Sequence, residues 1–424
     1  MKRKSIGFST LLWAILSTVT SAAQNVATDW NTIASTTIVK KGGKPSGAAS
    51  VWFAYAAIAT YDAVNAIDHQ SRPFYYAGTA PDVASAEAAA IAAAHRVLVS
   101  YFPIQQATLD AQFSSSLTAL KATPDAINAG VAVGEASAAA TVAARAGDGL
   151  EANVPYTPGS GLGVWQPTPP KFQAAATPWL GQMRPFTMTS ASQFLPKGPT
   201  PLGGEQWERD YNLTRVLGAA TSDVRTPSQT EIGLFWTEHT PQQYARAFGY
   251  LATNYKLTLS ETARLLAILW TGASDASIGC FNAKYHYSFW RPVTAIPVGG
   301  GNPDLPADPL WMPLGTTPNH PEYPAQHGCI SSAISQLIAG YFGTADVQIV
   351  VDSLVFSDGV HTHTFDSTDA LFDEVFWARI YAGFHFHHSL VDGERLGKQV
   401  ARQLLRKHFR LNSDDQDDRN SDED

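Results

Sequence analysis

Apolar residues recur along most of this chain three and four positions apart, which is the spacing of helices that bury one face. Residues 49–67 are apolar on most faces and predict a buried central helix. Further helices are predicted at 83–102, 106–120 and 125–144, where alanine-rich or amphipathic runs follow one another. Sustained apolar–polar alternation bounded by turns is not seen, so the pattern argues against a β-rich core.

A second series of helical segments follows residue 204. Thr258 and Glu261 have the spacing of a capping box that opens a helix at 259. The chain therefore predicts an all-α protein of two stacked helical bundles, an N-terminal one over residues 24–146 and a C-terminal one over residues 204–411. The helices of the second bundle are expected at 205–217, 229–236, 242–255, 259–281, 328–342 and 369–405, the last interrupted at Gly383.

Residues 147–203 differ in kind, because proline, glycine and scattered aromatic residues replace the helical pattern. Long irregular segments in compact proteins are usually linkers or functional loops. The aromatic residues Trp165, Trp179, Phe186 and Phe194 favour a packed connector that lies over the helices rather than a disordered linker.

The two ends of the chain have their own compositions. Residues 1–23 combine three cations, a short apolar run and small residues, which predicts a cleaved secretory signal and a secreted or periplasmic protein. No other segment is expected to supply the roughly 18 apolar residues of a membrane span. Residues 412–424 are strongly acidic and predict a disordered tail.

The formal net charge of the whole chain is −8. Removing the three cations of the signal, and the seven acids and one arginine of the tail, leaves about −5. Nucleic-acid-binding domains are typically basic, so this balance argues against a nucleic-acid partner. The oligomeric state is left open by the sequence, and a homo-oligomer remains compatible with it.

Three short segments in the C-terminal half collect cations and histidines within otherwise apolar sequence: KYHYSFWRP at 284–292, HPEYPAQHGC at 320–329 and ARIYAGFHFHHS at 378–389. Isolated cations are costly to bury, so their collection suggests a bound anion that balances them. Lys284 and Arg291 are seven residues apart, so we expect them near the same face of one helix that ends at Pro292. His327 is expected early in a helix, where free N–H groups favour anions.

One other reading of this region remains open. Eight of the twelve histidines lie between His286 and His388, which is also compatible with a histidine-rich metal-binding protein. Cations beside a divalent metal ion would, however, be electrostatically unfavourable.

Cys280 and Cys329 lie close to two of the three segments, and either a disulfide between them or two buried thiols is compatible with an exported chain.

The pattern K-x6-R-P, Y-P-x-x-H and R-x5-H resembles that of the vanadium-dependent haloperoxidases and their relatives, the type-2 phosphatidic acid phosphatases and bacterial acid phosphatases. The continuation WRPVTAI and the upstream YDAVNAI and VWQPTPP look most similar to the haloperoxidase branch. The resemblance covers most of the chain after the signal. It implies an all-helical protein with two four-helix bundles that binds vanadate, or phosphate in the phosphatases, within a cage of cations.

The resemblance also implies residue roles. Lys284, Arg291 and Arg379 would neutralise the oxyanion, and the backbone N–H of Gln326 would donate to it. His385 would supply Nε2 as the vanadium ligand, or as the nucleophile that forms a phosphohistidine. His327 would be the acid/base, which deprotonates peroxide or protonates a leaving oxygen.

The chain departs from the family motifs at three positions. Ala325 stands where serine is usual in P-S-G-H, Ala378 replaces the usual serine before the third-motif arginine, and Ser389 stands where many phosphatases carry aspartate. Loss of one hydrogen bond to a charged group costs about 1.5–3 kcal/mol, so Ala325 is expected to weaken anion binding without abolishing it.

The residue seven positions before the acid/base histidine differs between members of the family that oxidise different halides. Chloroperoxidases of the family carry an aromatic residue there and bromoperoxidases a histidine, and this chain has His320. Phe281 is expected to form the opposite wall of the site. A turn-capping role for His320 beside Pro321 is the alternative.

The resemblance therefore implies an exported vanadate-dependent haloperoxidase that oxidises halide with hydrogen peroxide, with bromide favoured over chloride if His320 lines the site. The first alternative is a phosphomonoester hydrolase that acts on a small phosphoester through a phosphohistidine at the same site. A degenerate, non-catalytic member of the family is the other alternative.

Overall fold

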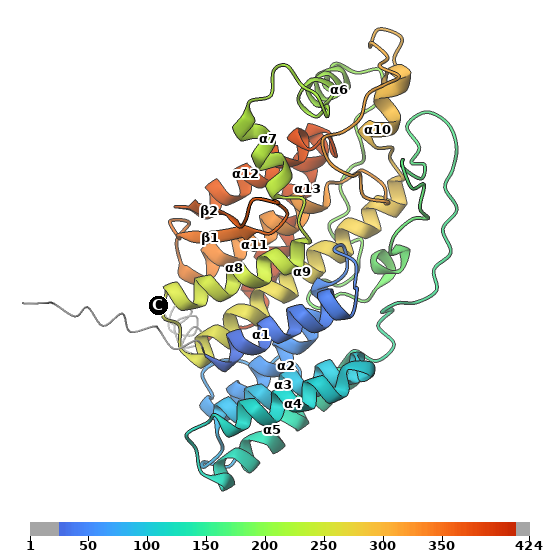
Figure 1. Cartoon of the computed structure of the whole chain (residues 1–424). Coiled ribbons are helices and arrows are strands. Elements are labelled where there is room, and N and C mark those ends of the chain that lie inside the picture. The colour runs from blue at the N-terminus through green and yellow to red at the C-terminus, as the bar shows by residue number, and fades with distance from the viewer. Residues whose placement is uncertain (1–24, 413–424) are drawn as a thin grey trace, which may run out of the picture.

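The structure is a computed structural model, and it describes residues 25–412. Its regular structure is mostly helical and forms two bundles, as the sequence pattern predicts (Figure 1). The predicted signal and nearly all of the acidic tail lie outside the described residues. The helices are α1 (Val26–Ser35), α2 (Ser50–Asp68), α3 (Ala86–Tyr101), α4 (Gln106–Thr118), α5 (Pro124–Ala144), α6 (Glu205–Leu217), α7 (Pro227–Phe235), α8 (Thr240–Asn254), α9 (Leu259–Tyr287), α10 (Pro292–Ala295), α11 (Gln326–Phe342), α12 (Thr368–Tyr381) and α13 (His387–Lys407).

The N-terminal bundle is built on the contacts of α2 with α3 and α5. Nearly every residue of α2 is buried, as expected for a helix that is apolar on most faces. Gly130 and Gly134 let α5 approach α3 closely, because a Cβ atom at either position would collide with the backbone of α3 or of the residue that precedes it. The alanine-rich sequence of α3 and α5 therefore serves close helix packing.

The composition of α5 contradicts one expectation. By length and mean hydropathy this helix qualifies as a candidate membrane span, whereas no span after the signal was expected. Its alanines and valines raise the mean hydropathy, and the face that packs in the bundle is formed by small residues, with Val133 and Ala138 buried among them. Core helices of soluble proteins pass the same test.

Helix α9 lies between the two bundles and contacts α2, α11 and α13 (Figure 1). The capping box predicted at its start is confirmed, since Thr258 and Glu261 each cap the backbone N–H of the other. Stacking of Phe53 on Trp270, with ring centroids 4.1 Å apart, fixes α2 against its middle. The last two turns of α9 carry Phe281 and Lys284 to the C-terminal bundle.

The C-terminal bundle centres on the pair α11 and α13, which lie in extensive contact. Gly328, Gly393 and Gly397 sit at this contact, where a Cβ atom would crowd or collide with the backbone of the facing helix. The predicted break at Gly383 is confirmed: this residue has φ +75° and separates α12 from α13. Because the contact lies at the N-terminal ends of α11 and α13, it brings the second and third cationic segments together.

A two-stranded antiparallel hairpin, β1 (Ile349–Ser353) and β2 (His361–Phe365), was not predicted. It pairs Ile349 with Phe365 and Val351 with His363. Its strands are only five residues long and β2 is mostly polar, so they carry little hydrophobic alternation. The prediction of a core without a sheet is unaffected, since the hairpin lies at the edge of the bundle (Figure 1).

Residues 147–203 have little regular structure and run along the side of the molecule away from the hairpin (Figure 1). They are nevertheless anchored, because the indole of Trp165 is fully buried. The buried carboxylate of Asp275 in α9 also accepts the backbone N–H groups of Phe186 and Thr187, each at 2.7 Å. This segment therefore packs on the helices and supplies part of the wall of the site.

Candidate active site

The second and third cationic segments line a cavity of about 840 Å³, and the first segment contacts them through Arg291, which bonds to His320 and His385. The second segment contributes His320, Gln326 and His327, and the third contributes Arg379 and His385. Phe281 reaches the same cavity from α9. Residues separated by about a hundred positions in the chain thus line one cavity, which is the convergence that an oxyanion site requires.

Lys284 and Arg291 do not lie on one helix, so that expectation is wrong. Helix α9 ends at Tyr287, and Ser288 takes the left-handed conformation with φ +48°. Arg291 is extended at the start of α10, as expected for a residue before proline. The intervening Phe289 and Trp290 are buried in a separate apolar cluster, and their burial explains why the helix stops earlier than Pro292.

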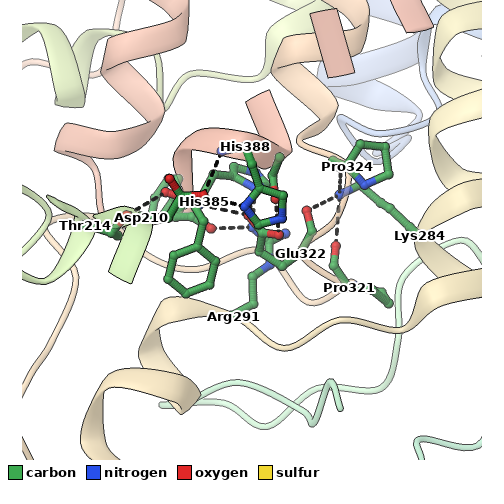
Figure 2. A network of polar contacts seen from close by, with 12 residues as sticks. Asp210, Thr214, Lys284, Arg291, Pro321, Glu322, Pro324, His385 and His388 are labelled. Carbon is green, nitrogen blue, oxygen red and sulfur yellow. Dashed lines mark hydrogen bonds and ion pairs between the residues drawn. The ribbon is translucent and has the colours of Figure 1, made fainter. Parts of the chain in front are cut away.

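Lys284 is fully buried and lies behind the cavity wall. Its Nζ donates to the carbonyl oxygens of Pro321, Glu322 and Pro324 at 2.9, 3.0 and 2.6 Å (Figure 2). An ammonium group has three donors, so all of them are used by the backbone of the second segment. In this structure Lys284 orders that segment and contributes its charge to the site through space.

Arg291 is also fully buried and touches two of the cavity histidines, His385 and His320. Its Nη1 donates to His385 Nε2 at 3.1 Å and to the carbonyl of Phe384 at 2.9 Å. Its Nε donates to the carbonyl of His320 at 3.0 Å, and its Nη2 lies 3.1 Å from His320 Nδ1. The guanidinium therefore ties the second and third segments together from the closed end of the site.

Arg379 projects from α12 into the cavity wall and is 2% exposed. Its Nη1 donates to the carbonyl of Trp236 at 2.7 Å, and its guanidinium lies over the ring of Phe384, 4.6 Å from the centroid. Its Nε is buried and has no hydrogen-bond partner within residues 25–412. A buried guanidinium donor without an acceptor is unfavourable, and an anion in the cavity would supply the missing acceptor.

The three cations raise the electrostatic energy of one another. Burial lowers the pKa of Lys284 to about 8, that of Arg291 to about 10 and that of Arg379 to about 9; for Arg379 the charge of Arg291 adds to the effect. Burial and the same cations hold the pKa values of His320, His327 and His385 well below the ordinary histidine value. The imidazoles are therefore neutral, and the site carries excess positive charge.

Glu322 is the carboxylic acid among these groups and was not identified from the sequence. It is fully buried, and burial raises its pKa. Its Oε1 accepts His385 Nδ1 at 2.9 Å and the N–H of Phe386 at 3.0 Å, while Oε2 accepts Ser389 Oγ at 2.6 Å (Figure 2). The available signal was an acid inside the apolar, proline-flanked sequence HPEYP, beside the proposed cationic site. One carboxylate cannot balance three cations.

His327 and Gln326 stand in the first turn of α11, at the cavity. His327 Nε2 lies 3.0 Å from Thr240 Oγ1, and the side-chain amide of Gln326 donates to the carbonyl of Gly47 at 3.2 Å. Ala325 precedes them and supplies no side-chain cap. The first N–H groups of a helix lack intrahelical acceptors, so this end of α11 adds donors beside the cations.

His320 and Phe281 form one wall of the cavity instead of two opposite walls. Their ring centroids are 5.1 Å apart, which leaves no space for a substrate between them. His320 Nδ1 also lies 3.2 Å from the carbonyl of Pro321, so the imidazole both borders the cavity and contacts the turn. The two readings of this residue are therefore not exclusive.

Cys280 and Cys329 are both buried and free, so the reading of two buried thiols is correct and the disulfide is not formed. The two side chains lie within hydrogen-bonding contact across α9 and α11, which lowers the pKa of Cys280 although burial opposes it. Cys280 Sγ also lies 3.6 Å from the carbonyl of Pro324. The expected proximity of the first two segments is thereby confirmed.

The histidine-rich alternative finds no support within residues 25–412, where no group of three or more His, Cys, Asp or Glu side chains could hold a metal ion. His361 and His363 of β2 are instead paired with acids. His361 Nδ1 lies 2.9 Å from Glu231, and His363 Nδ1 lies 2.7 Å from Glu374. These histidines fasten the hairpin to α7 and α12, outside the cavity.

Comparison with known proteins agrees with this geometry. Residues 264–414 match the family model described as the VCPO second helical-bundle domain. The vanadium chloroperoxidase of Curvularia inaequalis is 28% identical over 222 residues, which cover 45% of this chain and 36% of that protein. The matched part of the chain thus spans about a third of the length of this relative.

Two solved structures share the fold. A bacterial vanadium-dependent iodoperoxidase superposes with a TM-score of 0.78 at 21% identity and covers 91% of this chain and 96% of its own. The holo form of a bacterial vanadium-dependent chloroperoxidase gives a TM-score of 0.67 at 17% identity, with 88% and 93% covered. The family model thus matches residues 264–414, and the two superpositions show that the fold of these vanadium-dependent peroxidases extends over most of the chain.

Proposed function

We propose that this protein is a vanadate-dependent haloperoxidase that oxidises halide with hydrogen peroxide. The observation that carries the proposal is the buried Nε of Arg379, which lines the cavity and has no hydrogen-bond partner within residues 25–412, with the buried cations Arg291 and Lys284 behind the wall. Vanadate fits this site because its negative charge and its oxygen acceptors are what the residues lack. When bound, vanadate supplies the activation of peroxide that side chains alone cannot provide.

The residues of the chain divide the remaining work. Arg379 and the first turn of α11 donate to the oxyanion, and Arg291 and Lys284 add charge from the closed end of the site. His385 would present Nε2 to the same oxyanion, from its place beside Arg291. His327 is neutral, is fixed by Thr240, and would accept the proton of the incoming peroxide.

The wall formed by His320 and Phe281 would meet the halide. A neutral imidazole and an aromatic ring provide a polarisable surface for a large anion, with Arg291 directly behind His320. We propose that bromide is favoured over chloride on this basis. The named relatives include a chloroperoxidase and an iodoperoxidase, so the halide has to be measured for this chain.

A phosphomonoester hydrolase is the second candidate. It is favoured by one feature, the neutral His385 whose Nε2 faces the cations, because such an imidazole is also a competent nucleophile toward a phosphoryl group. In that case phosphate would occupy the oxyanion site, and His327 would protonate the leaving oxygen.

One experiment separates these functions. Purified protein is freed of anions by dialysis and assayed for bromide, chloride and iodide oxidation with peroxide, and for release of nitrophenol from its phosphate ester without peroxide. Added vanadate should raise the first activity and inhibit the second. His385→Ala serves as the inactive control in both assays. Halide oxidation that stays at the level of this variant at saturating vanadate would refute the haloperoxidase, and absence of both activities would indicate a degenerate member.

We also propose that the protein is exported. The support is the composition of residues 1–23, which lie outside the described structure. N-terminal sequencing of the protein recovered from the medium or the periplasm should begin after Ala23. Recovery of the intact N-terminus from the cell interior alone would contradict this.

A further inference from the structure

Glu322 makes contacts that differ from those of the buried carboxylates Asp62 and Asp275. The carboxylates of Asp62 and Asp275 accept backbone N–H groups of irregular segments, and Asp275 also accepts a threonine hydroxyl. They thereby fasten loops to helices, and neither borders the cavity. Glu322 instead uses Oε1 on the imidazole of His385, a cavity residue (Figure 2).

The hydrogen bonds around His385 allow only one arrangement of its proton. Arg291 Nη1 is a donor and cannot accept, so His385 Nε2, 3.1 Å away, presents a lone pair. On the other side, Glu322 Oε1 already accepts the N–H of Phe386, so it acts as an acceptor toward His385 Nδ1 as well. Both contacts therefore require the neutral tautomer that carries its proton on Nδ1.

The position of Glu322 is itself fixed from several directions. Its backbone N–H donates to the carbonyl of Phe289 at 2.9 Å, and its carbonyl accepts Lys284 Nζ at 3.0 Å. Its second carboxyl oxygen accepts Ser389 Oγ at 2.6 Å from the first turn of α13. Because Glu322 is held at both its backbone and its carboxyl group, it can hold the imidazole of His385 in place.

We propose that Glu322 is a positioning residue that locks His385 in the Nδ1–H tautomer, so that Nε2 keeps a lone pair, which accepts Arg291 Nη1 in this structure and would coordinate the oxyanion in place of that contact. The inference rests on the proposed oxyanion site and adds to it the group that prepares the imidazole. Ser389 completes the arrangement by occupying the second carboxyl oxygen. Partners of this kind behind a ligating histidine typically affect affinity by about 10- to 100-fold.

The tautomer can be measured on the unmodified protein. Nitrogen-15 NMR of protein labelled at histidine distinguishes a protonated from an unprotonated ring nitrogen, and His385→Gln assigns the signals. We expect His385 to show a protonated Nδ1 and an unprotonated Nε2 at neutral pH without any anion. The opposite tautomer, or equal signals from both, would overturn the proposal. This measurement needs no anion, so it remains valid if the proposed function fails.

The consequence for binding is tested with two anions of similar shape. His385 Nε2 would act as a nitrogen ligand to vanadate but not to phosphate, so the ratio of the two dissociation constants reports the His385 lone pair. Glu322→Leu removes both acceptors and should weaken vanadate relative to phosphate by about tenfold or more. Glu322→Gln keeps an acceptor for Nδ1 and should restore most of that ratio. Equal weakening of both anions in Glu322→Leu would indicate mere structural support and refute the proposal.

Asp210→Asn provides the matched control. Asp210 is an equally buried carboxylate whose Oδ2 lies 2.6 Å from Nδ1 of His388, a histidine that does not line the cavity. This variant should leave the vanadate-to-phosphate ratio unchanged, and a change as large as that in Glu322→Leu would contradict the proposal. If Glu322→Leu does not fold, the tautomer of the unmodified protein and the ratio in Glu322→Gln decide. Failure of the unmodified protein to bind either anion would instead refute the proposed function.

Discussion

Replacing Ala325 with serine tests the oxyanion site at the position where the chain departs from the motif P-S-G-H. Ala325 is the N-cap of α11, is fully buried, has extended backbone angles and makes no side-chain cap. The next two residues, Gln326 and His327, line the cavity. A hydroxyl group at this position would therefore stand at the start of the helix and beside the proposed anion.

The magnitude follows from the bonding capacity of a hydroxyl group, which has one donor and two acceptors. It can accept a first-turn N–H of α11 and donate to the anion at the same time. The cap contributes about 1 kcal/mol of stability, and the bond to the anion about 1.5–3 kcal/mol, or roughly one to two decades in affinity. Ala325 also packs in an apolar cluster with Phe372 and Leu390, so a hydroxyl that found neither partner would cost about 1–3 kcal/mol.

The assay combines thermal unfolding without anion and calorimetric titration with vanadate. Ala325→Ser should raise the melting temperature slightly and tighten vanadate by at least tenfold. Ala378→Ser is the matched control, because Ala378 is equally buried beside Arg379 but lies within α12, where a hydroxyl bonds back to the preceding turn. A higher melting temperature with unchanged vanadate affinity would show that the start of α11 does not meet the anion, and would refute this part of the site.

Four further predictions test the cations and the halide wall. Arg379→Gln should weaken vanadate binding by about one to two decades in affinity, because it removes donors to the anion. The melting temperature of the anion-free protein should not fall, because the substitution removes a costly buried charge. A large loss of stability would argue for a structural role. His320→Phe should change the ratio of bromide to chloride oxidation while vanadate affinity stays within about threefold; an unchanged ratio would exclude His320 from the halide wall. Sulfate, which keeps its charge over this range, should bind more weakly as pH rises through about 8, where Lys284 loses its proton; a flat calorimetric profile from pH 6.5 to 9.5 would contradict this. Over the interval from about 8 to the ordinary lysine value, the anion-free fold should gain stability with pH, because the unfolded chain still holds the proton that the folded chain has lost.

The helices were predictable because their signal is local. Apolar periodicity, the capping box at Thr258 and the break at Gly383 each depend on a few neighbouring residues, and the structure confirms all three features. The end of α9 was placed wrongly for the opposite reason. Its stop at Ser288 depends on burial of Phe289 and Trp290 against distant aromatic residues, which no local pattern records.

The site was predictable as a set of residues and less so as a geometry. Motif spacing identified the cations and histidines that converge, but it could not show that the three donors of Lys284 go to backbone carbonyls. Glu322 was missed because a single acid has no periodicity, and its meaning appears only once His385 is beside it. The hairpin was missed because the acids that hold its histidines come from separate helices. His361 is paired with Glu231 of α7, and His363 is paired with Glu374 of α12.

The arrangement of the C-terminal bundle explains how the chain retains a site that opposes its own folding. Burial that lowers the pKa of Lys284 to about 8 corresponds to a cost on the order of 3 kcal/mol for the charged form, and two buried arginines add to it. The backbone contact of Gly328 with α13 lies within one turn of His327, so the costly groups are held by close helix packing that cannot relax one residue at a time. An anion that enters the cavity removes much of the cost by balancing the charge. The folded chain already holds the buried cations at an electrostatic cost, and an anion bound beside them would lower that cost. A preformed site of this kind favours strong and selective binding of an oxyanion.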